Sequence, residues 1–101
     1  MEWETINPGG WLSVAFAAPR ARRARVEVTI DVTEGGPVDV WAMPEDQLDR
    51  FSDGRMVEYY ERLRRVTEGS LRFTPDRGED WVLVIDNVGA VRVEVGYEVE
   101  W

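Results

Sequence analysis

Acidic side chains form two clusters that could do chemistry. The first cluster comprises Glu45, Asp46, Asp49 and Asp53, and the second comprises Asp76, Glu79 and Asp80. Loop carboxylates are the ligands that calcium prefers, and paired carboxylates hydrolyse glycosidic bonds. The chain has no D-x-D-x-D-G loop, and a domain of 101 residues offers no deep cleft for a sugar. We therefore interpret both clusters as solvated surface and expect no metal and no cofactor.

The missing residue types restrict the chemistry further. The chain contains no histidine and no cysteine, and all twelve basic residues are arginine. The commonest general base, the thiolate nucleophile and the lysine amine are therefore all absent. The sequence predicts a protein that is not an enzyme.

Four arginines lie close together between two predicted strands. They are Arg20, Arg22, Arg23 and Arg25. Guanidinium groups bind phosphates and carboxylates bidentately, so this run is a candidate site for an anion or an acidic partner. The alternative, which we favour, is a solvated turn whose arginines pair with nearby carboxylates. No aromatic residue interleaves the run, which argues against stacking on single-stranded nucleic acid.

Trp41 and Met43 are the strongest candidates for a binding surface. They share a strand face with Asp39, opposite Val38 and Val40. Aromatic and methionine side chains together on an outer face are typical of binding surfaces. The alternative is that residues 44–63 fold back and cover this face, because large apolar patches are rarely left exposed. The sequence leaves both alternatives open.

The two runs nearest the C-terminus show the alternation of β-strands. From Trp81 to Ile85 both faces are apolar, so this strand should be covered on both sides. The second run, residues 91–101, alternates apolar and mostly charged residues, which predicts a one-sided strand that buries Trp101. Gly96 in its middle predicts a bulge or bend.

Similar alternation predicts further strands at residues 2–6, 11–18, 26–32, 38–43 and 71–74. Short strands separated by regular turn signals are typical of an antiparallel β-sandwich. We therefore predict one all-β domain spanning residues 1–101, built from two sheets. The predicted core comprises Val14, Phe16, Val28, Ile30, Val40, Phe73, Leu83, Val93 and Val95.

One short helical excursion interrupts the strands near residues 44–53. Pro44 suits a first helical turn, and Glu45 and Asp46 suit the positive end of the helix dipole. Residues 55–67 permit either an amphipathic helix or a strand, because Met56 and Tyr59 have helical spacing while the residue types also suit a sheet.

The order of elements in residues 25–101 resembles the GOLD domain and, more generally, bacterial prepeptidase C-terminal domains. The resemblance is carried by VDVWAMPEDQLDRFSDG and by GSLRFTPDRGEDWVLVIDNVGAVRVEVGYEV, with its Asp86-Asn87 corner. It implies a jelly-roll or GOLD-like sandwich that binds proteins without catalysis, and it favours strands after Tyr60. The signal, membrane span and disulfide of secretory GOLD proteins are absent, so their trafficking role does not carry over.

Charge and hydropathy limit the partners. A net charge of −8 opposes binding to nucleic acid or to anionic membranes. No apolar run approaches the roughly 18 residues of a membrane span, and no secretory signal is visible, so we expect a soluble cytoplasmic protein. We predict an adaptor module that binds a protein partner or itself. The alternative is a carbohydrate-binding module that uses exposed tryptophans.

Overall fold

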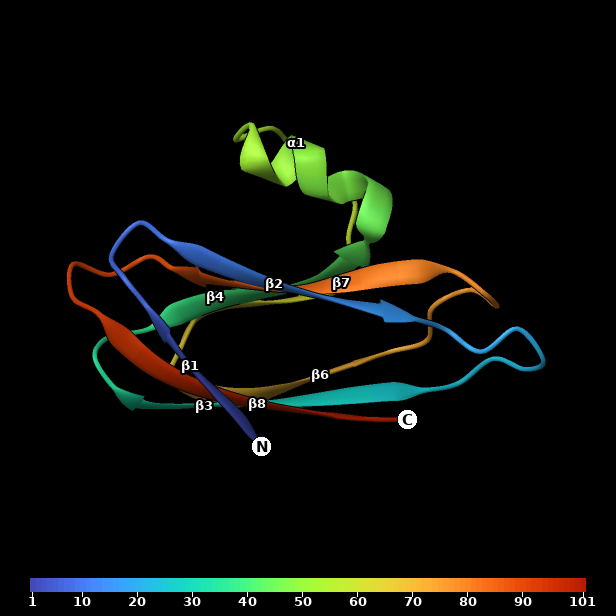
Figure 1. The fold of residues 1–101 in the computed structure, drawn as a ribbon, viewed down its shortest axis with the longest axis horizontal. Coiled ribbons are helices and arrows are strands. Elements are labelled where there is room, and N and C mark those ends of the chain that lie inside the picture. The colour runs from blue at the N-terminus through green and yellow to red at the C-terminus, as the bar shows by residue number, and fades with distance from the viewer.

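The computed structural model describes all 101 residues as eight strands and one short helical segment. The strands form two stacked antiparallel sheets, with the helical segment outside one of them (Figure 1). The elements are β1 (Glu2–Ile6), β2 (Trp11–Ala17), β3 (Val26–Glu34), β4 (Val38–Pro44), the 3-10 turn η1 (Glu45–Gln47), α1 (Leu48–Ser52), β5 (Glu61–Val66), β6 (Glu68–Phe73), β7 (Asp80–Asn87) and β8 (Val93–Glu100). The predicted all-β two-sheet sandwich is confirmed.

Strand order decides which strands are sheet edges. One sheet runs β1-β8-β3-β6, which we call sheet A, and the other runs β2-β7-β4-β5, which we call sheet B. The closing strand β8 is therefore an inner strand of sheet A, covered by β1 along Val93 to Tyr97. The four edges of the sandwich are β1 and β6 in sheet A, and β2 and β5 in sheet B.

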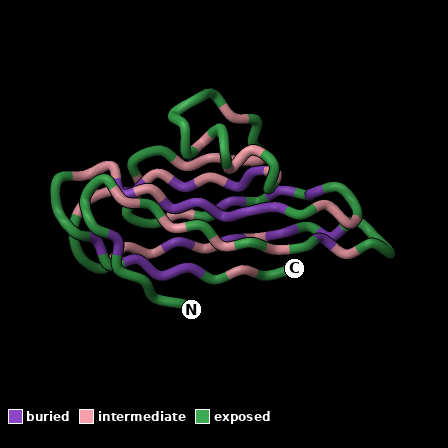
Figure 2. The backbone as a smooth tube through the Cα atoms, turned by 45° about the horizontal axis from the view of Figure 1, so that its top comes forward, coloured by how far each residue is buried: buried purple, intermediate pink, exposed green.

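The main core lies between the two sheets, and buried residues concentrate along the strands (Figure 2). Its largest member is Trp81, whose ring stacks on Phe16 at a centroid distance of 4.6 Å. All predicted core residues are buried except Val14 and Phe16, which are only partly buried. Both belong to β2, and an edge strand has no neighbour to cover its outer side.

A second, smaller core covers the outer face of sheet B. Residues 45–60 connect β4 to β5, and we call this whole segment the excursion. Met43, Val82 and Val84 are buried beneath it, against Leu48, Phe51 and Val57. The strand from Trp81 to Ile85 is thus covered on both sides, as its two apolar faces predicted. The excursion itself lies above the sheet and connects β4 to β5 (Figure 1).

Residues 55–67 resolve into two parts. Residues 55–60 have no regular helix or strand, and β5 follows from Glu61 to Val66. The helical alternative is therefore wrong, and the strand alternative holds only for the second part. Tyr59 packs edge-on against Trp41 of sheet B, whereas Met56 is almost fully exposed, so the spacing of the two residues marks no helix face.

Two predictions about the last strand are wrong. Trp101 is 50% exposed, and its ring contacts the rings of Phe16 and Trp81 edge-on. Gly96 itself forms no bulge, because it pairs in register with Trp3 of β1 and with Asp31 of β3; the irregularity in the pairing of β3 with β8 lies close by, between Val32 and Glu34 of β3. A Cβ atom at Gly96 would approach the Trp3 ring to 2.8 Å, so the glycine makes room for that indole.

Asn87 ties the end of β7 to its surroundings. Its buried amide Nδ2 donates to the carbonyls of Ile6 and Val91, each at 2.9 Å, and its Oδ1 accepts from the Gly89 amide at 3.0 Å. The side chain therefore fixes the turn after β1 and the loop before β8 in one place. None of the helical segments has the length and apolar character needed to cross a membrane.

Candidate functional site

Cross-strand pairing brings the polar residues of sheet B together on its outer face. Asp39 of β4 pairs with Asp86 of β7, and Asp86 in turn pairs with Trp11 of β2. One row further along, Trp41 pairs with Arg62 of β5. Alternate residues of a strand share a face, so these five side chains lie side by side outside the main core.

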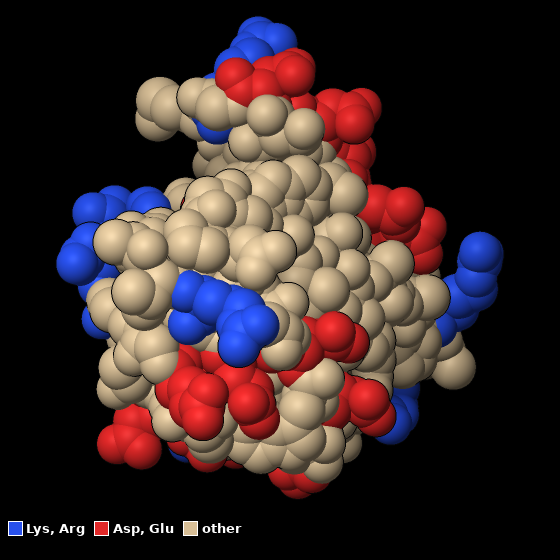
Figure 3. All heavy atoms as spheres, turned by 60° about the vertical axis from the view of Figure 1, so that its left-hand side comes forward, with Lys and Arg blue, Asp and Glu red and all other residues tan.

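These side chains and the excursion enclose a cavity of about 510 Å³, which we call the aromatic pocket. It is lined by Trp11, Trp41, Phe51, Met56, Val57, Tyr59, Arg55, Arg62, Arg64 and Asp86, with Gly9, Ser52 and Gly54. Gly9 belongs to the turn between β1 and β2, so one side of the pocket lies at the end of the sandwich where this turn is. At that end, charged side chains of both signs surround an area without charge beneath the protruding excursion (Figure 3).

The rings of the pocket meet edge to face. Phe51 lies 5.2 Å from Trp11 and 6.0 Å from Trp41, measured between ring centroids. Tyr59 lies 5.3 Å from Trp41, and the two ring planes are 83° apart. Such perpendicular rings form the walls of a cleft, whereas coplanar rings would form a flat platform.

Arg62 is the charged centre of this face. Its guanidinium carbon lies 3.6 Å from the centroid of the Trp41 ring, and its NH2 group donates to Asp39 at 3.1 Å. Both members of the ion pair are largely shielded from solvent. The Nε of Arg62 and the indole nitrogen of Trp41 are buried without a hydrogen-bond partner. Each such orphaned donor costs about 1–3 kcal/mol, and the main core has orphaned donors as well, at Trp81 and Tyr60.

Asp39 also holds a strained segment of the edge strand β5. Its carboxylate accepts the backbone N–H of Arg65 at 2.8 Å. Arg65 has a φ of 51°, the only positive φ outside glycine, at an irregularity in the pairing of β4 with β5. A non-glycine residue keeps this conformation only where its surroundings impose it, and the Asp39 bond is the contact that does so here.

Asp86 has an altered acidity. Desolvation by burial raises the pKa of its carboxyl above the usual value of 3.8, the charge of Asp39 raises this pKa further, and Arg62 opposes both effects. Asp86 is the one carboxyl among the residues that line the pocket, and a ligand that displaces water there would add to the same desolvation.

The structure treats the two predicted binding residues differently. Trp41 lines the aromatic pocket, whereas Met43 is fully buried beneath the excursion. Of the two alternatives that the sequence left open, the covered one describes Met43. At Trp41 the cover is incomplete, and the incomplete cover is what creates the pocket.

The arginine run is not part of this pocket. Arg20, Arg22, Arg23 and Arg25 are exposed on the loop that follows the last residue of β2, whereas Trp11 at the pocket is its first residue. Arg23 pairs with Asp76 at 3.2 Å, and both side chains are mostly exposed. The run therefore resembles the solvated turn that we favoured, with one of its arginines paired to a nearby carboxylate.

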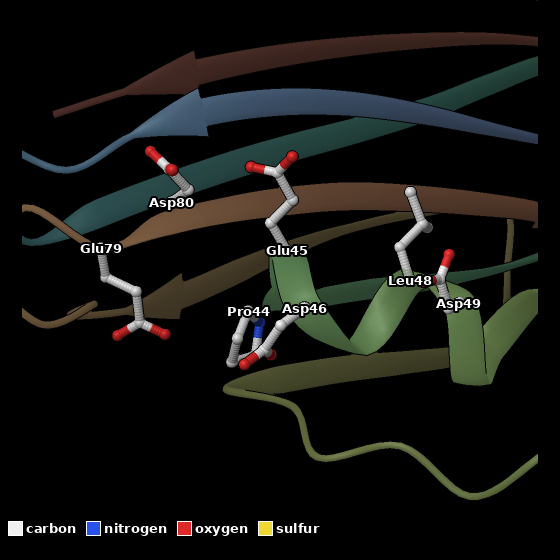
Figure 4. A pocket seen from close by; sticks show the side chains of 7 residues that line it. All are labelled: Pro44, Glu45, Asp46, Leu48, Asp49, Glu79 and Asp80. Atoms are coloured by element: carbon white, nitrogen blue, oxygen red, sulfur yellow. The ribbon is translucent and has the colours of Figure 1, made fainter.

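The two acidic clusters meet at the other end of the excursion. Glu45, Asp46 and Asp49 line a shallow bay with Glu79 and Asp80 of the β7 start. Their carboxylates do not converge, since Glu45 and Asp80 extend to one side of the bay and Asp46 and Glu79 to the other (Figure 4). No group of three or more acidic residues in the structure is arranged to hold a metal ion.

Sequence reasoning missed Phe51, Tyr59, Arg62 and Asp86 as pocket residues. Their positions depend on strand register and on the path of residues 53–60, and neither has a local signal. A scan against protein-family models and a search of curated proteins both found no match to this chain. The GOLD-like resemblance therefore stays a prediction.

Proposed function

We propose that this domain is a non-catalytic protein-interaction module that binds its partner through the aromatic pocket. The observation that carries the proposal is the exposure of large apolar side chains around one hollow. Met56 is 91% exposed, Tyr59 49% and Trp11 39%, although all three line the same cavity. A partner that covers them removes this surface from water and gains binding free energy.

The residue types of the pocket support a protein partner. Tryptophan, tyrosine, methionine and arginine are the residues enriched at protein interfaces and at their energetic hot spots. Arg55 and Arg64 stand at the pocket without any ion pair, in a chain that carries a net charge of −8. The partner we propose inserts one apolar side chain between the rings and presents acidic residues to these two arginines.

A carbohydrate is the second candidate, and one observation favours it. Partly exposed Trp11 and Tyr59 lie beside the polar groups of Arg62 and Asp86. Sugar sites combine apolar walls with a few fixed hydrogen-bonding groups in this way. The perpendicular rings suit a single sugar residue in the cleft and oppose a flat polysaccharide surface.

The test uses a displayed peptide library and a glycan array on the same protein. We expect wild-type protein to select peptides with an apolar anchor flanked by acidic residues. A Met56→Glu/Tyr59→Ser variant should lose this binding while keeping its fold, because both side chains are largely exposed. Val91→Glu is the matched control, since Val91 is also exposed but lies on the loop before β8, outside the pocket.

The two ligand classes give different results. Peptide binding that survives in the Met56→Glu/Tyr59→Ser variant would remove the pocket from the proposal. Glycan binding that this variant abolishes, with no peptide selected by the wild type, would replace the protein partner with a carbohydrate.

A further inference from the structure

The four edge strands of the sandwich are protected unequally. β1 carries Glu2 and Glu4 on the face that it shares with buried Ile6, and β6 carries Glu68 and Arg72. β5 contains four charged residues and the irregularity at Arg65. Inward-facing charges, charged side chains and bulges are the devices that prevent an edge from pairing with another chain. β2 reads WLSVAFA and has none of them.

The side chains of β2 are also incompletely buried. Leu12, Val14 and Phe16 point toward the core but remain partly exposed. A cavity of about 360 Å³ opens beside them, lined by Val14, Phe16, Tyr97 and Val99 among others. β1 covers β8 only up to Tyr97. The gap between the edges of the two sheets, which we call the seam, is therefore open beside β2.

We propose that β2 is a self-association edge, at which a second copy of this chain adds its own β2 antiparallel across a twofold axis at Val14. In this register Leu12 lies opposite Phe16 of the second copy on the inward face, and Val14 meets its own equivalent. On the outward face Trp11 lies opposite Ala17, and Ser13 opposite Ala15. Apolar side chains thus lie opposite apolar ones on the inward face, and the large Trp11 lies opposite the small Ala17 on the outward face. Sheet B then continues from one copy into the next.

Charge explains why this edge suits a second copy. Two chains of net charge −8 repel each other, and like charges opposite each other in a ladder are destabilising. β2 is the one edge strand without a charged residue, so pairing through it opposes no two charges of the strand in any register. Trp11 of β2 also lines the aromatic pocket, but Ser13 and Ala15 do not, so substitutions at these two residues change the edge without changing the pocket.

Repulsion between the two copies of Glu2 weakens the association. Glu2 lines the seam beside Val14, so the twofold axis brings the two copies of Glu2 toward each other. Their repulsion weakens the dimer and is screened by salt. Pairing of two short strands buries on the order of 1,000 Å², the lower end of specific interfaces, so we expect a weak dimer.

Sedimentation equilibrium of the full chain from micromolar to millimolar concentration tests this. We expect a monomer–dimer equilibrium that tightens with added salt and in a Glu2→Gln variant. Ser13→Lys/Ala15→Lys should weaken the dimer about tenfold or more, because it creates two like-charge cross-strand pairs. Ser13→Lys/Ala15→Glu makes those same pairs opposite in sign and should restore wild-type affinity or exceed it.

Both double variants change exposed side chains, and circular dichroism verifies that they fold. Ser70→Lys on the β6 edge is the control and should leave the equilibrium unchanged, because this residue is exposed on the opposite side of the sandwich. A wild type that stays monomeric at millimolar concentration overturns the proposal. So does a dimer that survives Ser13→Lys/Ala15→Lys, or one that both double variants weaken equally.

Discussion

The two faces of β7 are both buried, yet they are built differently. Trp81, Leu83 and Ile85 face the main core between the sheets, where no charged side chain is buried, although the indole nitrogen of Trp81 lacks a hydrogen-bond partner. Val82, Val84 and Asp86 face the excursion, where an ion pair, two orphaned donors and an open pocket remain. The inner face is what a fold needs to be stable. The outer face differs in its partly buried ion pair and its open pocket, and this difference points to it as the site of function.

The largest expected effect compares one residue from each face. Leu83→Ala should lower the free energy of unfolding by about 2–5 kcal/mol, because Leu83 is fully buried in the main core. Val84→Ala on the outer face truncates a smaller side chain that is equally buried and should cost about 1–2 kcal/mol. Urea unfolding of both variants measures the difference. Equal losses would show that the two faces are packed alike.

Asn87 tests the one buried polar side chain on the inner side. Asn87→Ala leaves the carbonyls of Ile6 and Val91 and the amide of Gly89 without their partner, at a cost of about 2–3 kcal/mol. Asn7→Ala, at an exposed position of the adjacent turn, is the control and should change stability by less than about 0.5 kcal/mol. Thermal melts monitored by circular dichroism are sufficient.

Arg62 tests the outer face in the same way. Arg62→Met keeps the length of the side chain but removes the ion pair with Asp39 and the contact with the Trp41 ring, which should cost about 1–2 kcal/mol. Arg72→Met, which breaks the exposed pair with Glu27, should cost under about 0.5 kcal/mol. A neutral Arg62→Met would contradict a net stabilising role for the pair.

The smallest effect concerns pH. Because the folded state raises the pKa of Asp86, the protonated form contributes stability below 3.8, and this contribution is lost as pH rises through the raised folded value. Asp86→Asn does not undergo this loss. The free energy of unfolding of Asp86→Asn should therefore increase relative to that of wild type as pH rises from 3.8. It should remain the higher of the two at neutral pH. An advantage that does not vary with pH would contradict the raised pKa.

Most of the fold follows from local alternation. Val28 and Ile30, or Val93 and Val95, are buried because each strand has one apolar face, and that pattern is visible residue by residue. The two apolar faces of Trp81 to Ile85 even predict that something covers sheet B from outside. Residues near chain ends and edges were predicted less well. Trp101 follows the apolar face of its strand, yet the sheet ends before it.

The candidate site was predicted only at Trp41. Arg62 reaches the Trp41 ring because β5 pairs with β4 in one register, and a shift of one residue would point Arg62 into the core instead. Phe51 and Tyr59 arrive through a segment without regular structure, whose path depends on tertiary contacts. Long-range register and irregular segments have no period in the sequence, so no local pattern identifies these residues.

The place of β8 between β1 and β3 has a consequence for how the chain folds. β8 comes later in the sequence than every other strand, yet both of its neighbours in sheet A need it before they are fully paired. As the chain is synthesised, β1 therefore waits without its partner until β8 has emerged. Closing a loop of this length makes folding slow, in the range of milliseconds to seconds for all-β domains. During that interval the uncharged β2 is the segment most exposed to premature pairing between nascent chains.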